Sequence, residues 1–167
     1  MINKINKLPK SEFIKFFANI FENAGWIAEE LYKQKPFKGF DELSSKMMNI
    51  FEISSKEKKL KILNDHPDLG DKAEISLLTP DSLKEQTSVG LDQCTKEEFN
   101  EFKKLNDGYK KFGFPFILAV KGKSKIEILN NFRKRINSEP QVEFEEAIKQ
   151  VKKIASLRLK SLNSKNI

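Results

Sequence analysis

The side chain best suited to acid–base chemistry is that of His66, the single histidine of this 167-residue chain. An imidazole titrates near neutral pH, so it can take up and return a proton under physiological conditions. The neighbouring Pro67 and Gly70 predict that His66 lies at a helix end or in a loop. Two interpretations stay open at this point: a general acid or base, or an exposed or structurally satisfied histidine.

Other chemistry at His66 has less support in the sequence. Zinc sites need three or four His, Cys or acidic ligands at suitable spacing, and the chain has one histidine and one cysteine. We therefore expect no metal. A nucleophilic pair of Cys94 with His66 stays open, but no motif supports it. Cys94 precedes a predicted helix cap, and we interpret it as a bystander.

A second cluster of polar residues lies near residue 80. Thr79 is a predicted N-cap, with Pro80 at the first helical position and Ser82 and Glu85 in the opening turns. Glu85 is one of the residues that could carry chemistry. The alternative is that Ser82 and Glu85 form one more capping pair, and without other information that alternative is preferred.

Arg158 occupies an unusual position. It continues a series of apolar residues spaced by four and three, which predicts a buried helical stripe: Phe144, Ile148, Val151 and Ala155. A buried guanidinium must be paired or must bind an anion. Two interpretations are equally supported: anion binding, or a helix-end arginine that pairs with a glutamate or a carbonyl.

The net charge is +7, from 31 Lys and Arg against 24 Asp and Glu. An excess of positive charge suggests an anionic partner such as nucleic acid. Only Arg133, Arg135 and Arg158 are arginines, however, and the lysines alternate with acidic residues along the chain. We interpret most of them as a solvated surface, with Arg133 and Arg135 at the surface or at an interface.

Composition sets the class of protein. A chain with 38% hydrophobic and 33% charged residues is too apolar for disorder and too charged for a membrane protein. The first seven residues lack the apolar stretch of a signal peptide, and a single cysteine cannot form an internal disulfide. We expect one cytoplasmic domain over residues 1–167.

The elements that must position these side chains are predicted to be helices, about eight in number. Apolar residues recur with helical spacing in seven stretches, around residues 13–20, 26–31, 43–51, 60–63, 99–109, 129–136 and 144–162. Asp41 is a plausible N-cap, and three pairs have the spacing of a capping box: Ser54 with Glu57, Thr95 with Glu98, and Ser124 with Glu127. The chain is predicted to be all-α.

One segment departs from this pattern. Residues 112–120 read Phe-Gly-Phe-Pro-Phe-Ile-Leu-Ala-Val, a continuous apolar run that permits a short strand or a buried extended turn leading into a short helix. Its backbone groups must find partners. Such a segment is either a wall for a ligand or an apolar connector that fills the core, and the pattern alone favours the connector.

Three motifs together resemble one family. They are His-Pro-Asp-Leu-Gly at 66–70, Leu-Thr-Pro-Asp-Ser-Leu-Lys-Glu-Gln at 78–86, and the stretch 105–117 that ends in Phe-Gly-Phe-Pro-Phe-Ile. In order and spacing they resemble the 2-oxo-4-hydroxy-4-carboxy-5-ureidoimidazoline (OHCU) decarboxylase family over nearly the whole chain. The resemblance implies an all-α homodimer without a cofactor that acts in urate breakdown and forms (S)-allantoin.

The resemblance also implies a role for each candidate residue. It makes His66 the catalytic acid/base, assisted by Glu85, and Arg158 the arginine that holds a small anionic substrate. The remaining substrate-binding positions are Pro67, Ser82, Gln86, Ile117, Leu118 and Ala119, the last three through their backbone. It implies neither a nucleic-acid nor a membrane partner. A helical anion- or nucleic-acid-binding module, a scaffold, and a related ureido-imidazoline as substrate are the alternatives.

Overall fold

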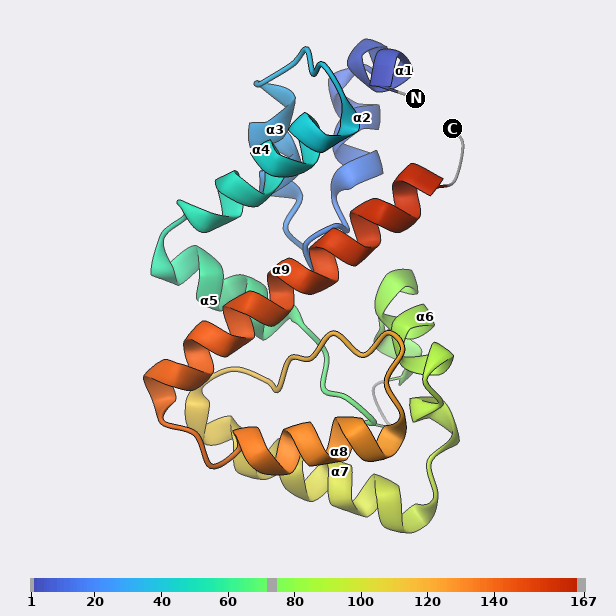
Figure 1. Ribbon diagram of the computed structural model, residues 1–167, viewed down its shortest axis with the longest axis vertical. Coiled ribbons are helices and arrows are strands. Elements are labelled where there is room, and N and C mark those ends of the chain that lie inside the picture. The colour runs from blue at the N-terminus through green and yellow to red at the C-terminus, as the bar shows by residue number, and fades with distance from the viewer. Residues whose placement is uncertain (1, 72–74, 165–167) are drawn as a thin grey trace. The chain divides into compact units, whose positions relative to one another are not determined.

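Every regular element that the computed structural model describes, over residues 2–71 and 75–164, is a helix (Figure 1). Nine are α-helices and three are short 3-10 helices within those ranges. The all-α prediction is confirmed. The chain divides into two compact units, one containing residues up to Asp65 and from Lys152 onward, the other running from His66 to Val151. The single domain expected from chain length stays a prediction, and each unit is described by itself.

The first unit contains five complete helices and the C-terminal part of the long helix α9. The five are α1 (Ile2–Lys7), α2 (Lys10–Phe17), α3 (Gly25–Tyr32), α4 (Phe40–Glu52) and α5 (Lys56–Asp65), and α9 runs over Pro140–Ser164. Helix α3 packs against both α2 and α4. Phe13, Phe17 and Phe51 are fully buried, so the aromatic stripes predicted from helical spacing form the core of this unit.

Two predicted helix starts in the first unit are wrong. The N-cap of α4 is Gly39, and Asp41 lies in the first turn of the helix. At α5 the cap hydrogen bond runs from the Lys58 N–H to the Ser55 hydroxyl, one residue beyond the predicted Ser54. The Ser54 hydroxyl instead donates to the Phe51 carbonyl at 2.7 Å. Adjacent serines offer two caps of equal propensity, and the path of the preceding chain decides between them.

The second unit contains the remaining elements and the first part of α9. These elements are η1 (Ile75–Leu77), α6 (Pro80–Ser88), η2 (Leu91–Gln93), α7 (Lys96–Tyr109), η3 (Lys110–Phe112) and α8 (Lys125–Arg135). The capping boxes of Thr95 with Glu98 and of Ser124 with Glu127 are confirmed, with both reciprocal hydrogen bonds in place. Helices α7 and α8 lie side by side (Figure 1).

Between η3 and α8 the chain is extended without pairing as a strand. Phe112 closes η3, and residues 113–120 are neither helix nor strand. Phe116 stacks on Phe132 of α8 with ring centroids 3.9 Å apart, and Tyr109 of α7 meets both rings edge-on. Aromatic packing therefore anchors this segment to α7 and α8. None of the helices described is both long and apolar enough to cross a membrane.

Candidate active site

His66 directly follows the last residue of α5 and is 9% exposed. Its position at a helix end is as predicted, and the alternative of an exposed histidine is wrong. Pro67 and Asp68 are half-buried, and Leu69 and Gly70 are buried. Residues 66–70, called the His66 loop below, thus form an enclosed turn rather than a surface connection.

The His66 loop is tied to α6 by the amide of Gln86. This side chain is 2% exposed and makes two hydrogen bonds to the loop backbone. Its Nε2 donates to the Asp68 carbonyl at 3.1 Å, and its Oε1 accepts from the Gly70 N–H at 3.1 Å. Gln86 therefore satisfies one donor and one acceptor of a buried loop, which sets the path of the chain beyond His66.

Helix α6 presents the predicted residues on one face. Ser82, Glu85 and Gln86 have the i, i+3, i+4 spacing of a single helix face, and Gln86 fixes that face against the His66 loop. Ser82 is buried and Glu85 is half-buried. The structure therefore brings together the two motifs that carry His66 and Glu85.

The capping alternative for Ser82 and Glu85 is wrong. Thr79 is the N-cap of α6, its hydroxyl accepts from the Ser82 N–H at 3.3 Å, and Pro80 occupies the first turn. The helix start is thus satisfied by Thr79, as predicted. Glu85 lies a full turn beyond the cap, where its carboxylate does not serve helix initiation.

Helix α7 holds the other side of the His66 loop. Asn106 is 6% exposed, and its Nδ2 donates to the Leu69 carbonyl at 3.0 Å. A Cβ at Gly70 would lie 2.7 Å from Cγ of Phe102, so only glycine allows this approach. Asn106 was not among the residues predicted to form the site. The signal was available, because Asn106 lies between Phe102 and Tyr109 on one apolar helical stripe.

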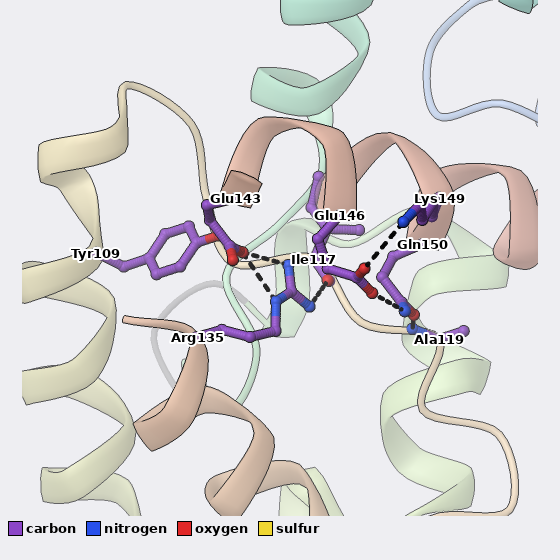
Figure 2. A network of polar contacts seen from close by, with 8 residues as sticks. All are labelled: Tyr109, Ile117, Ala119, Arg135, Glu143, Glu146, Lys149 and Gln150. Carbon is purple, nitrogen blue, oxygen red and sulfur yellow. Dashed lines mark hydrogen bonds and ion pairs between the residues drawn. The ribbon is translucent and has the colours of Figure 1, made fainter. Parts of the chain in front are cut away.

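A buried ionic network supports the extended segment, which comprises residues 113–120 (Figure 2). Arg135 is 7% exposed, so the prediction that it is a surface or interface residue is wrong. Its Nε donates to Glu143 at 2.8 Å and its Nη2 forms a close ion pair with the same carboxylate. Its Nη1 donates to the Ile117 carbonyl at 2.7 Å. Arg133, by contrast, is half-exposed and pairs with Glu101.

Tyr109 completes this network. Its hydroxyl donates to Glu143, the same carboxylate that pairs with Arg135. The side chain is fully buried, and burial together with the Glu143 carboxylate raises the pKa of Tyr109 well above its usual value. The phenol therefore remains a neutral donor throughout the physiological pH range.

A second contact reaches the same segment from α9. The Ala119 N–H donates to Oε1 of Gln150 at 3.0 Å, and Nε2 of Gln150 donates to Glu146 at 2.8 Å (Figure 2). Ile117, Leu118 and Ala119 are all at most 5% exposed. The three residues predicted to bind substrate through their backbone thus form a buried stretch that side chains from α8 and α9 hold at both ends.

Arg158 belongs to the first unit, whereas the other candidate residues belong to the second. It is 7% exposed, and its Nη1 donates to the Asn19 carbonyl and to Glu22, each at 2.9 Å. The prediction that this arginine is buried is confirmed, as is its pairing with a glutamate and a carbonyl. Val151 and Ala155 of the predicted stripe are buried as well, whereas Phe144 and Ile148 are half-buried. Anion binding by Arg158 stays a prediction.

Two further expectations concern metal and thiol chemistry. Among residues 2–71 and 75–164 there is no group of three His, Cys, Asp or Glu that could hold a metal ion. Cys94 is half-buried with its thiol 3.4 Å from the Leu91 carbonyl. Burial and the nearby Glu98 raise the pKa of this thiol, which disfavours the nucleophilic thiolate.

The all-α fold and the sequence of this chain both match proteins of one family. The family model described as OHCU decarboxylase matches residues 6–160. A protein named 2-oxo-4-hydroxy-4-carboxy-5-ureidoimidazoline decarboxylase from Halalkalicoccus jeotgali is 36% identical, over 96% of this chain and 90% of its own length. The chain belongs to the OHCU decarboxylase family.

Two longer proteins are also similar. The "Uric acid degradation bifunctional protein" of Bacillus sp. (strain TB-90) is 40% identical over 96% of this chain, which spans only 32% of that relative's length. A crystal structure of (S)-allantoin synthase superposes with a TM-score of 0.77 and 31% identity, covering 97% of this chain and 54% of the other. In both cases the match covers part of a larger protein.

Proposed function

We propose that this protein removes CO2 from OHCU and forms (S)-allantoin, a step of urate degradation, with His66 as the acid/base. Family membership supports the reaction. The observation that carries the assignment of His66 is its enclosed loop, which Gln86 holds against the α6 face that carries Ser82 and Glu85. An imidazole can take up and return a proton near neutral pH, and the side chain of His66 is buried.

The reaction is chemically feasible without a covalent electron sink. The substrate carries its carboxylate on a carbon next to a C=N carbon, so it resembles a β-keto acid with nitrogen in place of oxygen. When the C–CO2 bond breaks, its electron pair moves toward that nitrogen and leaves an enediamine-like enol. The enzyme must align the breaking bond with the C=N π system and stabilise the charge that spreads into the ring.

Protons must then be delivered to one face of the enol. The enol is planar, so protonation in free solution gives both hands of allantoin, whereas an enclosed site exposes one face. We assign this transfer to His66, acting at the substrate hydroxyl or at the new C–H centre. Glu85 fixes the tautomer of His66 or holds the ureido group.

The remaining candidates bind the substrate in this proposal. Pro67, Ser82 and Gln86 line the substrate beside His66, and the backbone of residues 117–119 contacts its ring and ureido groups. Arg158 binds its anionic or carbonyl oxygens. These assignments rest on the resemblance of their motifs to the family, as does the proposal that the chain forms a homodimer in the cytoplasm.

A direct experiment supplies urate with urate oxidase and follows the circular dichroism of the allantoin formed. Wild type should give (S)-allantoin. His66→Asn should lower the rate by about 100-fold or more, as expected for loss of a general acid/base. Lys84→Ala, at an exposed position of α6, is the control and should match wild type. A His66→Asn variant that folds and equals wild type would refute the assignment of His66.

The role of Arg158 is tested by Arg158→Lys. A lysine keeps the charge but cannot make the forked hydrogen bonds of a guanidinium, so turnover should fall. Arg133→Lys is the matched control, because Arg133 is half-exposed and pairs with a surface glutamate. If both variants turn over equally, Arg158 does not bind the substrate. A related ureido-imidazoline as the true substrate would instead leave wild type inactive on OHCU.

The buried arginines do not support the anion- or nucleic-acid-binding alternative, which rests on the net charge of +7. Arg135 and Arg158 are buried and each pairs with a buried carboxylate, Glu143 and Glu22 respectively. Two of the three arginines are therefore buried and do not contribute to an exposed basic surface for phosphates.

A further inference from the structure

We propose that Arg135 and Gln150 are positioning residues that orient the backbone of Leu118 toward the substrate. Each holds one of the two peptide units that flank Leu118. As a result, the N–H and C=O of Leu118 form a preset donor–acceptor pair for an amide or ureide edge. This inference deepens the proposed function and rests on it.

The first peptide unit joins Ile117 to Leu118. Arg135 Nη1 donates to its oxygen, the Ile117 carbonyl, at 2.7 Å. A trans peptide unit is planar, and its C=O and N–H point in opposite directions. The N–H of this unit is that of Leu118, so fixing the carbonyl directs the Leu118 N–H away from Arg135.

The second peptide unit joins Leu118 to Ala119. Gln150 Oε1 accepts its N–H at 3.0 Å. By the same geometry, the carbonyl of this unit points away from Gln150, and that carbonyl belongs to Leu118. Arg135 and Gln150 thus hold the Ile117 carbonyl and the Ala119 N–H. The N–H and the C=O of Leu118 point away from both side chains.

These two groups are available to a ligand. Within the described residues, no protein group is hydrogen-bonded to the backbone N–H or C=O of Leu118. The residue is 5% exposed, and buried backbone groups are nearly always paired. A substrate edge with one acceptor and one donor, as in an amide or ureide, would pair both.

Each positioning side chain is itself held in one orientation. Glu143 binds two nitrogens of Arg135, and the guanidinium lies over the Phe116 ring with 4.5 Å between its central carbon and the ring centroid. The Gln150 amide is oriented by Glu146, because a carboxylate can only accept and therefore faces the Nε2 group. The Oε1 of Gln150 is then left to accept from Ala119.

The test centres on Gln150, because Arg135 forms a buried ion pair whose loss would destabilise the fold. Gln150→Met keeps the length of the side chain and removes the acceptor for the Ala119 N–H. We expect kcat/KM for OHCU to fall by about 10-fold or more, as for a lost binding hydrogen bond, mainly through a higher KM. Gln141→Met is the matched control, since Gln141 lies on the same helix and its exposed amide bonds Glu145.

A rescue distinguishes positioning from a general structural role. The exchange Glu146→Gln with Gln150→Glu retains an oxygen for the Ala119 N–H and a hydrogen bond between the two side chains. It should restore most of the kcat/KM that Gln150→Met loses. If Gln150→Met equals wild type, if Gln141→Met loses as much, or if the exchange fails to restore kcat/KM, the inference is overturned.

A second measurement observes the wild-type protein directly by NMR. Adding (S)-allantoin to the ¹⁵N-labelled wild-type protein should shift the backbone amide resonance of Leu118, and Gln150→Met should reduce that shift. An unchanged Leu118 resonance at saturating (S)-allantoin overturns the inference. Failure of the proposed function gives a different result, because wild type would then form no (S)-allantoin at all.

Discussion

Replacing Gly70 with alanine tests how closely the His66 loop is packed against α7. Gly70 has φ +68°, and a Cβ there would lie 2.7 Å from Cγ and 2.8 Å from Cδ2 of Phe102. The Phe102 ring is fully buried and cannot swing away from the new methyl group. Two penalties therefore add at this position, one from backbone conformation and one from the clash.

The two penalties can be given magnitudes. A left-handed conformation costs a non-glycine residue roughly 1–2 kcal/mol, of which about 0.4–1 kcal/mol is offset by the lower entropy of the unfolded alanine chain. Forcing an extra carbon into a packed core costs about 1–3 kcal/mol more. Gly70→Ala should therefore lower the free energy of unfolding by about 1–5 kcal/mol in total.

Gly90→Ala isolates the contribution of the clash. Gly90 also has a positive φ, +77°, but no atom lies within 4 Å of its Cβ position. Urea unfolding followed by circular dichroism should show Gly70→Ala to be less stable than Gly90→Ala by about 1–3 kcal/mol. Activity of Gly70→Ala on OHCU should also fall, since the loop that carries His66 must shift.

If Gly70→Ala and Gly90→Ala unfold at the same urea concentration with equal slopes, the loop is not packed against Phe102 as described. Adding Phe102→Leu to Gly70→Ala makes room for the methyl group, so the two changes together should cost less than the sum of the separate effects.

Two further changes are predicted. Gln86→Leu leaves the Gly70 N–H and the Asp68 carbonyl without their partner and should lower the free energy of unfolding by about 2–4 kcal/mol, whereas Gln93→Leu, which removes an exposed amide, should cost little in the same urea assay. The raised pKa of Tyr109 makes its contribution pH-dependent: above about pH 10 the unfolded phenol ionises while the folded one keeps its proton, so the stability of wild type relative to Tyr109→Phe should fall by about 1.4 kcal/mol per pH unit. A constant difference between pH 8 and pH 11 would contradict this origin of the shift.

Some helix N-caps could be predicted from local sequence, and others could not. The capping boxes at Thr95 and Ser124 were predictable because each involves hydrogen bonds within four residues of the chain. At α5 the predicted cap was Ser54, whereas Ser55 caps the helix. When two neighbouring residues have similar N-cap propensity, the direction from which the preceding chain approaches the helix decides which of them caps it. That direction depends on tertiary packing.

Some residues of the candidate site could likewise be predicted from the sequence, and others could not. The order of the motifs indicated the family and named His66, Glu85 and the segment 117–119, since those signals lie in residue types and spacing. The burial of Arg135 was not predicted, although Arg135 follows Ile128 and Phe132 at helical spacing. A charged residue at a position of an apolar helical stripe is predicted to be buried. That pattern singled out Arg158, and it is present at Arg135 as well.

The sequence by itself determined the all-α class, the main helical stripes, the family and the residues with suitable chemistry, because these follow from local propensities and motif order. Tertiary structure alone decided how those residues are held. It showed that Gln86 binds the His66 loop and that Arg135 and Gln150 hold the two peptide units around Leu118. These contacts join residues 16 to 31 positions apart, and no local pattern specifies which distant backbone group a buried polar side chain will satisfy.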